Sequence, residues 1–276
     1  MRLRRALALG AAALTTATGL LAGPAAPAQA AATTLASTID LSNCSASLVR
    51  FPTSRSTDRA MMLTNGHCYE GGFQLNGVVL QNKTSARTGT LLDNTGAPLG
   101  PVQADQLLYA TMTGTDVTLY RLTATFLALR RQYGATALTI AGRPAATGAA
   151  ISIASGYWKR IWNCKLDGFV GQLREDEWTW HDSLRYDIGC DTIHGTSGSP
   201  IVDDASGQIV GINNTGNDNG EMCTLNNPCE VNADGTTSVR QGQSYGEQTY
   251  WFTTCLNRHR TIDLTVPGCL LSKPAS

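Results

Sequence analysis

Gly195-Thr196-Ser197-Gly198-Ser199-Pro200 is the stretch of sequence that decides the fold. It places a serine in a turn that is rich in glycine. A serine hydroxyl is a weak nucleophile unless a neighbouring base takes its proton, and a third group usually orients that base. The turn therefore directs attention to upstream residues that could serve as the base and as the orienting group.

Two upstream segments supply those groups. Thr64-Asn65-Gly66-His67-Cys68 provides an imidazole that could accept and return a proton. Thr115-Asp116-Val117-Thr118-Leu119 provides a carboxylate at the head of an apolar strand. Intervals of 49 and 81 residues separate His67, Asp116 and Ser197. An α/β-hydrolase needs the order Ser, Asp, His and a Gly-x-Ser-x-Gly elbow, so that class is disfavoured.

The first thirty residues have the pattern of a secretory signal peptide. Three arginines precede an apolar stretch from Ala6 to Leu21, and Ala28-Gln29-Ala30 offers a small-residue cleavage site. A membrane anchor is the weaker interpretation, because the stretch is short and rich in alanine and is followed by Gly23 and Pro24. We expect a secreted, extracellular product without a membrane segment in its mature form.

Cleavage after Ala30 would leave 246 residues, enough for one large β domain or two small barrels. The charges of the whole chain balance at 21 basic and 21 acidic residues, and loss of the three arginines leaves a net charge of −3. Such a chain has no electrostatic reason to bind nucleic acid or anionic lipid. All eight cysteines lie in the mature part, which indicates disulfides. The absence of a C-x-x-C pair argues against a zinc site.

Short apolar or alternating runs separated by Gly, Asn, Asp and Pro predict an all-β fold. We expect the segment from Leu129 to Pro144 to cross between two halves of the molecule. One helix is predicted, from about Tyr245 to Leu256, because Ser244-Tyr245-Gly246-Glu247 has the Ser-x-x-Glu form of a capping box.

The three motifs together resemble those of trypsin-like serine peptidases of the chymotrypsin fold, near the bacterial secreted forms that include the glutamyl-endopeptidase branch. The resemblance implies two packed antiparallel six-stranded β-barrels with a C-terminal helix. We expect a signal peptide over 1–30, a short N-terminal segment over 31–43, an N-terminal barrel over 44–130, a C-terminal barrel over 131–243, and a helix with a disulfide-tied tail over 244–276.

The resemblance also assigns roles to the site residues. His67, Asp116 and Ser197 would form the catalytic triad, and the backbone amides of Gly195 and Ser197 would form the oxyanion hole. No metal or other cofactor is needed. Together with the short spacings between the cysteines, the resemblance favours the disulfides Cys44–Cys68, Cys164–Cys190, Cys223–Cys229 and Cys255–Cys269.

Two positions depart from the pattern of the vertebrate relatives. Thr196 stands where those enzymes carry an aspartate that pairs with the new amino terminus, so we expect signal-peptide removal to suffice for activation. Asp191 matches the position that binds basic side chains in trypsin, and Thr192 follows it. It could instead be a turn element. Asn213 replaces the histidine with which the glutamyl-endopeptidase branch recognises acidic side chains.

These observations predict a secreted, monomeric serine endopeptidase that acts on protein or peptide substrates. The alternative is a protease-fold protein that binds through the same cleft without catalysis. All three triad residue types are present, which favours the enzyme.

Overall fold

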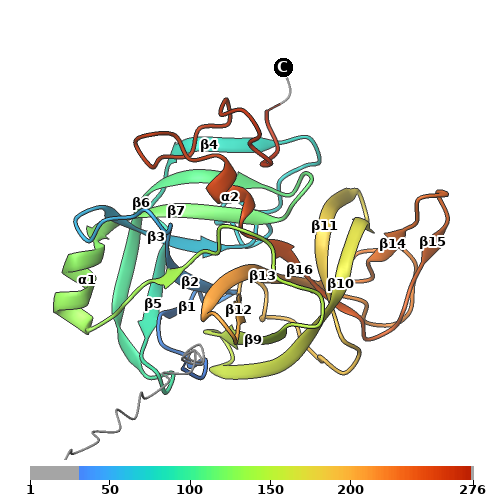
Figure 1. Ribbon diagram of the computed structural model, residues 1–276, viewed down its shortest axis with the longest axis horizontal. Coiled ribbons are helices and arrows are strands. Elements are labelled where there is room, and N and C mark those ends of the chain that lie inside the picture. The colour runs from blue at the N-terminus through green and yellow to red at the C-terminus, as the bar shows by residue number, and fades with distance from the viewer. Residues whose placement is uncertain (1–30, 275–276) are drawn as a thin grey trace, which may run out of the picture.

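The computed structural model describes residues 31–274, so the predicted signal peptide lies outside the described residues. Within this range the chain forms sixteen strands and two short helices, arranged as two β-barrels side by side (Figure 1). No helix of the described residues is long and apolar enough to cross a membrane.

The first barrel is a closed ring of six antiparallel strands. Strand pairing follows the order β1-β5-β6-β7-β3-β2, and β2 returns to β1. β4 pairs with β6 off this path, and the short β8 joins β2 in parallel. The strands are β1 (Thr38–Asp40), β2 (Ser45–Arg50), β3 (Arg59–Thr64), β4 (Val79–Thr84), β5 (Thr88–Leu92), β6 (Pro98–Thr111), β7 (Val117–Thr125) and β8 (Leu138–Thr139).

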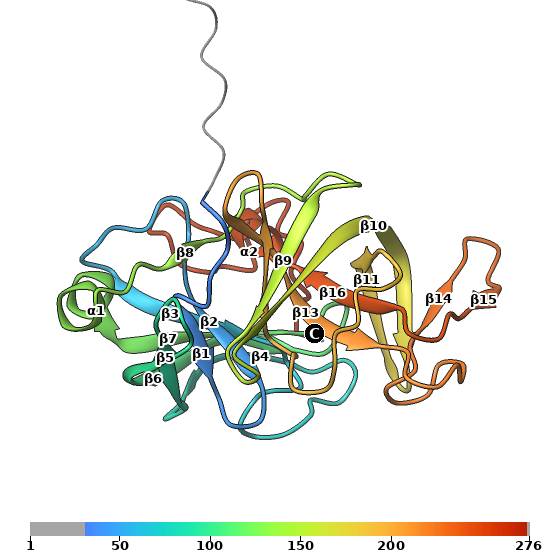
Figure 2. The same ribbon diagram turned by 90° about the horizontal axis from the view of Figure 1, so that it is seen from below.

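The second barrel closes in the same way, in the order β11-β16-β13-β12-β9-β10, with β10 paired back to β11. β14 and β15 extend β10 outward as an arm (Figure 2). The strands are β9 (Ala150–Ser155), β10 (Arg160–Glu175), β11 (Trp178–Tyr186), β12 (Pro200–Asp203), β13 (Gln208–Gly216), β14 (Cys229–Val231), β15 (Thr237–Ser238) and β16 (Ser244–Gln248). The prediction of an all-β, two-barrel fold is thus confirmed.

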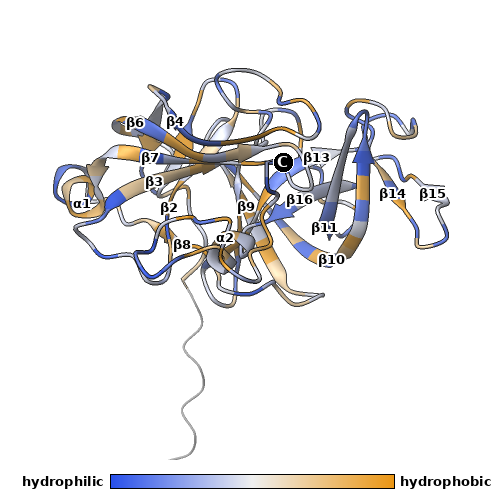
Figure 3. Cartoon of the chain, turned by 90° about the horizontal axis from the view of Figure 1, so that it is seen from above, coloured by the Kyte–Doolittle hydropathy of each residue, from blue (hydrophilic) through white to orange (hydrophobic). Residues whose placement is uncertain are grey.

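Side-chain alternation explains why these segments form barrels. Along β10 buried and exposed residues alternate, which gives the strand one face toward the core and one toward solvent (Figure 3). Each barrel has its own apolar cluster, around Leu48, Met62 and Tyr120 in the first and around Ile153, Leu184 and Ile201 in the second. A third cluster joins the two barrels, because it contains Leu119 of β7 together with Ile209 and Ile212 of β13.

The predicted helix over Tyr245–Leu256 is wrong in its first half. Residues Ser244–Gln248 are the strand β16, which lies between β11 and β13 with all five residues buried. Helix α2 covers only Trp251–Thr254. A capping box requires the glutamate to reach back to its own helix terminus. Here the Glu247 carboxylate instead accepts hydrogen bonds from Thr115, Ser183 and Asn214.

Helix α1 (Phe126–Tyr133) begins inside the first predicted barrel segment and extends into the crossing, and the sequence did not predict it. The Thr125 hydroxyl accepts from the Ala128 amide at 3.1 Å, which is an ordinary N-cap. Gly134 ends the helix at a φ of 69°, and its amide donates to the Arg130 carbonyl. Because Leu129 is the single buried residue of this helix, its hydrophobic pattern is weak.

The C-terminal segment from Trp251 to Ser272 returns from the second barrel onto the first (Figure 1). Trp251, Phe252 and Leu271 belong to the apolar cluster between the barrels. The Tyr109 hydroxyl donates to the Ser272 carbonyl at 3.0 Å, and the Ser272 hydroxyl donates to the Thr113 carbonyl at 2.6 Å. The segment is therefore attached to the first barrel by both apolar and polar contacts.

Four disulfides are present, and they are the pairings that the resemblance implies: Cys44–Cys68, Cys164–Cys190, Cys223–Cys229 and Cys255–Cys269. Each closes a short loop, the longest with a sequence separation of 26 residues. Each bridge therefore stabilises one region of the molecule, and none joins the first barrel to the second.

Candidate active site

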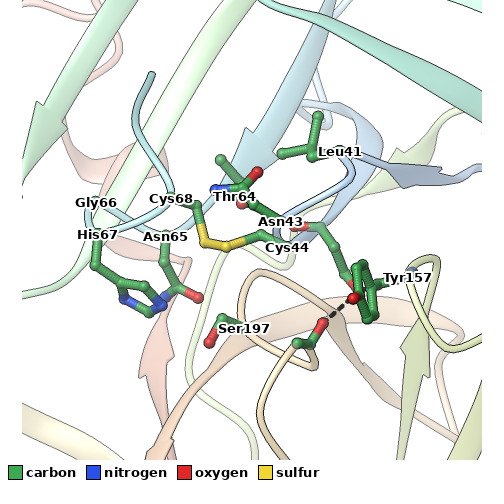
Figure 4. The surroundings of a disulfide bond; sticks show 12 residues. Leu41, Asn43, Cys44, Thr64, Asn65, Gly66, His67, Cys68, Tyr157 and Ser197 are labelled. Atoms are coloured by element: carbon green, nitrogen blue, oxygen red, sulfur yellow. Dashed lines mark hydrogen bonds between the residues drawn. A yellow bond between two sulfur atoms is a disulfide. The ribbon is translucent and has the colours of Figure 1, made fainter. Parts of the chain in front are cut away.

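His67 lies in a tight turn directly after β3. The Cys68 amide donates to the Asn65 carbonyl, and the Tyr69 amide donates to that of Gly66, at 3.3 and 3.0 Å. The Cys44–Cys68 disulfide holds this turn against the start of β2 (Figure 4). Only glycine fits at position 66, because a Cβ atom there would lie 2.1 Å from the Thr111 carbonyl oxygen and 2.7 Å from Asp116 Oδ1.

Asp116 immediately precedes β7 and is 1% exposed. Its Oδ2 lies 2.7 Å from His67 Nδ1, and its Oδ1 accepts from the His67 backbone amide at 3.0 Å. The Asn65 side chain donates to the Asp116 carbonyl at 2.9 Å. Both carboxylate oxygens therefore contact the same residue, which fixes the imidazole with Nδ1 toward the acid and Nε2 free to face the cleft.

The electrostatic balance at His67 favours its protonated form. Burial by itself lowers the pKa, but the charge of Asp116 and the hydrogen bond to it outweigh that effect. The pKa of His67 is therefore raised above its ordinary value of 6.5. An imidazole in this environment is a stronger base than one in water.

Ser197 is positioned by one contact to each barrel. Its carbonyl accepts from the Ser45 amide of β2 at 2.8 Å, and its hydroxyl donates to the Asn214 carbonyl of β13 at 3.3 Å. A Cβ atom on Gly198 would lie 2.1 Å from the Ser45 carbonyl oxygen, so glycine is required for this close approach. Ser197, His67 and Asp116 all line one cavity of about 330 Å³ between the barrels, and Figure 4 shows Ser197 and His67 beside the disulfide.

The turn before Ser197 presents two backbone amides. Gly195 has a φ of 88°, which glycine adopts readily. Within residues 31–274, neither the Gly195 amide nor the Ser197 amide donates a hydrogen bond to another protein group. Both residues line the cavity. Two free amides beside a serine hydroxyl are suited to bind a developing oxyanion.

The three residues predicted for specificity lie in different places. Thr192 and Asn213 line the cavity. Asn213 is 2% exposed; its amide donates to Thr196 Oγ1 at 3.0 Å, and its oxygen accepts from the Tyr186 hydroxyl at 3.1 Å. Asp191 is exposed and lies outside the cavity lining, with its carbonyl accepting from Trp162 Nε1 at 2.7 Å. Asp191 is thus not among the cavity-lining residues, and no backbone amide of residues 31–274 donates to its carboxylate, as the turn-element alternative would require.

Thr196 is held without an ion pair. Its hydroxyl oxygen accepts from Asn213 and also donates to the Ile193 carbonyl. These bonds connect the turn that carries Ser197 to β13. The loop before Ser197 is therefore ordered by hydrogen bonds within residues 31–274.

Two buried acids at the site were missed by sequence reasoning. Glu247 of β16 is fully buried behind Asp116 and accepts from Thr115, Ser183 and Asn214 at 3.1 to 3.2 Å. Burial, together with the negative charge of Asp116, raises the pKa of Glu247 to about 8, so its carboxyl is mostly uncharged at pH 7. The Ser-x-x-Glu spacing predicted a helix terminus at Glu247, so the sequence did not indicate a buried carboxyl near Asp116.

The second acid, Glu175 at the end of β10, lines the cavity on the side of His67. Its carboxylate accepts from the Thr215 hydroxyl and, at 2.8 Å, from the Asn226 amide. Burial raises its pKa. No local sequence pattern distinguishes it from an ordinary strand-end glutamate.

One group of possible metal ligands occurs at the site in the described part of the chain. Cys44, His67 and Cys68 have ligand atoms within 4.8 Å of one another. Both sulfurs belong to the disulfide, however, and a disulfide sulfur offers no thiolate to a metal. This group therefore lacks the chemistry of a metal site.

Comparison with known proteins defines the class. A family model described as the trypsin-like peptidase domain matches residues 53–212. The chain therefore belongs to the trypsin-like peptidase family. A search of curated proteins found no match.

Solved structures of proteases are similar to the chain at low sequence identity. A Nocardiopsis protease is 13% identical, with 76% of this chain and 89% of that chain covered and a TM-score of 0.45. The Cellulomonas bogoriensis chymotrypsin is 17% identical, with 68% and 78% covered and a TM-score of 0.39. The active form of the Rv3671c protease from M. tuberculosis is 13% identical, with 87% and 81% covered and a TM-score of 0.42.

Proposed function

We propose that the protein is a secreted serine endopeptidase in which Ser197 is the nucleophile, His67 the general base and Asp116 the group that orients His67. The observation that carries this proposal is the 2.7 Å contact between His67 Nδ1 and Asp116 Oδ2, in a cavity that Ser197 also lines. This arrangement leaves His67 Nε2 as the nitrogen available to a hydroxyl proton.

The proposed reaction proceeds through an acyl-enzyme. His67 takes the Ser197 proton as Oγ attacks the scissile carbonyl, and the Gly195 and Ser197 amides bind the resulting oxyanion. His67 then gives the proton to the leaving amine, and the peptide C–N bond breaks. Water, deprotonated by His67, hydrolyses the ester on Ser197 and restores the enzyme. One chain supplies all of these groups, so the proposed reaction needs no residue from a second chain and no cofactor.

Secretion is part of the proposal and is supported by the pattern of residues 1–30 and by the four disulfides, which persist in oxidising compartments. Protein and peptide substrates are proposed because the family is one of peptidases. The bonds between Thr196 and Asn213 support activation by signal-peptide removal alone, since the nucleophile turn is ordered without a new amino terminus.

Labelling with a fluorophosphonate tests the proposal against a silent binding protein. The mature chain that starts at Ala31 should be labelled on Ser197, and the His67→Ala variant should react far more slowly because its hydroxyl keeps its proton. Mass spectrometry locates the adduct. Folded wild-type protein that neither takes the label nor cleaves a peptide library would favour the binding protein.

The pH dependence of kcat/KM should report the titration of His67. Because only the neutral imidazole can accept the Ser197 proton, activity should rise with pH through the His67 pKa, with a midpoint above 6.5. A His181→Ala variant, altered at an exposed histidine, should keep the same midpoint. A midpoint below 6.5 in the wild type would contradict the role of Asp116 in raising this pKa.

A further inference from the structure

The peptide bond between His194 and Gly195 is held by an indole outside the cavity. Trp158 Nε1 donates to the His194 carbonyl at 2.8 Å. Trp158 is 47% exposed, and among the described residues it is not part of the cavity lining, whereas Gly195 is. His194 also lines the cavity, but its carbonyl points at a side chain outside the lining.

The orientation of that carbonyl determines the orientation of the next amide. No cis peptide bond occurs in the described residues, and in a trans peptide the C=O and N–H groups point in opposite directions. Since the His194 carbonyl points at Trp158, the Gly195 N–H points toward the cavity. This amide is one of the two proposed oxyanion donors.

The backbone alone does not hold this orientation. Gly195 has a φ of 88°, and rotation of the peptide by half a turn would give a negative φ, which glycine adopts about as readily. The rotated peptide would direct the His194 carbonyl oxygen into the site in place of the amide. An oxygen there would repel an oxyanion, so an external contact has to select the productive orientation.

Trp158 is fixed relative to the nucleophile by a short chain of hydrogen bonds. Its backbone amide donates to Ser155 Oγ at 3.1 Å, and that hydroxyl lies 2.8 Å from Ser45 Oγ. The Ser45 amide in turn donates to the Ser197 carbonyl. The Tyr157 ring packs edge-on against the Trp158 ring, with 5.1 Å between their centroids. In Figure 4, Tyr157 and His67 lie on opposite sides of Ser197.

We propose that Trp158 is a positioning residue that keeps the His194–Gly195 peptide in the orientation that completes the oxyanion hole. The inference rests on the proposed function, because an oxyanion hole has a use only in acyl transfer. Trp158 would therefore stabilise the transition state without changing the affinity for the bound substrate.

The test compares Trp158→Phe with Trp162→Phe. Both variants remove an indole N–H that donates to a main-chain carbonyl of the same loop, but Trp162 donates to Asp191, outside the oxyanion peptide. Kinetic constants for a peptide substrate and the Ki of a peptide aldehyde are measured for each variant. The aldehyde forms a hemiacetal with the serine and therefore needs the oxyanion donors, whereas substrate binding does not.

Trp158→Phe should lower kcat about fivefold or more, because loss of one net hydrogen bond shifts an equilibrium by about that factor. KM should stay within about twofold and the aldehyde Ki should rise in proportion to the fall in kcat, since the lost interaction acts in the transition state. Trp162→Phe should leave both kcat and the aldehyde Ki close to their wild-type values.

The inference would be overturned if Trp158→Phe lowered kcat by less than about threefold, or if both variants lowered kcat equally. If Trp158→Phe does not fold, replacement of Trp158 by 3-benzothienylalanine keeps the shape of the indole and removes only its N–H. A wild-type chain without peptidase activity would instead refute the proposed function. Failure of the two proposals can therefore be told apart.

Discussion

Replacement of Asp116 by asparagine should lower kcat about ten-thousandfold while the protein stays folded. Asp116 accepts at both oxygens, from the imidazole and from the backbone amide of His67. Asparagine can keep the bond from the backbone amide through its oxygen. Its NH2 group would then face Nδ1 as a donor, which places the imidazole proton on Nε2, where it blocks acceptance of the Ser197 proton.

The same substitution should change the titration of His67. Burial lowers this pKa, and the charge and hydrogen bond of Asp116 are the largest influences that raise it, followed by the charge of Glu175. The His67 pKa of Asp116→Asn, followed by NMR of the ring protons, should therefore lie below that of the wild type. Activity and titration are thus two independent measures of one contact.

Asp191→Asn is the matched control, because it makes the same chemical change at an exposed carboxylate outside the cavity. Its kcat should remain within about threefold of the wild type, as expected for a surface group that does not touch the site. Retention of more than about a tenth of kcat in Asp116→Asn would exclude the proposed orienting role.

The second large effect concerns the buried carboxyl of Glu247 and the stability of the fold. Its pKa is about 8 in the folded protein, whereas the ordinary pKa of a glutamate carboxyl is 4.5. A group whose folded pKa is raised contributes stability below its unfolded pKa and loses it as the pH rises through the folded value. Between pH 4.5 and pH 8 the loss amounts to about 5 kcal/mol for a shift of this size.

Glu247→Gln should remove this dependence. Glutamine has nearly the same shape. Its oxygen can accept from Ser183 and Asn214, its NH2 group can donate to the Thr115 hydroxyl, and it does not ionise. Unfolding in urea, measured from pH 5 to pH 9, should show that the wild type loses stability relative to the variant as the pH rises. At pH 9 the variant should be the more stable protein.

Glu177→Gln, at an exposed glutamate, provides the control and should follow the wild type at every pH. Other groups, among them His67 with its raised pKa, also make stability depend on pH. They are common to all three proteins, so the difference between wild type and variant isolates Glu247. Parallel stability curves for wild type and Glu247→Gln would refute a neutral carboxyl behind Asp116.

The sequence was sufficient to predict the two barrels because the nucleophile turn, the histidine turn and the aspartate strand each carry a local signature. Gly66 and Gly198 are part of those signatures for a physical reason, since neither turn has room for a Cβ atom. The three proposed triad residues, which line one cavity, are therefore residues whose motifs were recognisable along the chain.

Features that depend on three-dimensional packing were not predictable in this way. Ser244 and Glu247 have the spacing of a capping box, and only the insertion of β16 between β11 and β13 makes them strand residues. The contact of Trp158 is made to a main-chain carbonyl, which leaves no trace in residue types. Asp191 matches by sequence the position that binds basic side chains in trypsin. That match does not show whether its carboxylate points into the cavity, and this direction decides whether it can bind substrate.

The attachment of the C-terminal segment to the first barrel has a consequence for biosynthesis. His67 and Asp116 belong to the first barrel and Ser197 to the second, while Trp251, Phe252 and Leu271 complete the cluster that lies between the barrels. Residues 251–272 leave the ribosome after every member of the proposed triad. This late segment can add its apolar contacts to the cluster between the barrels only after His67, Asp116 and Ser197 have been synthesised, so a nascent chain holds these three residues before that cluster is complete.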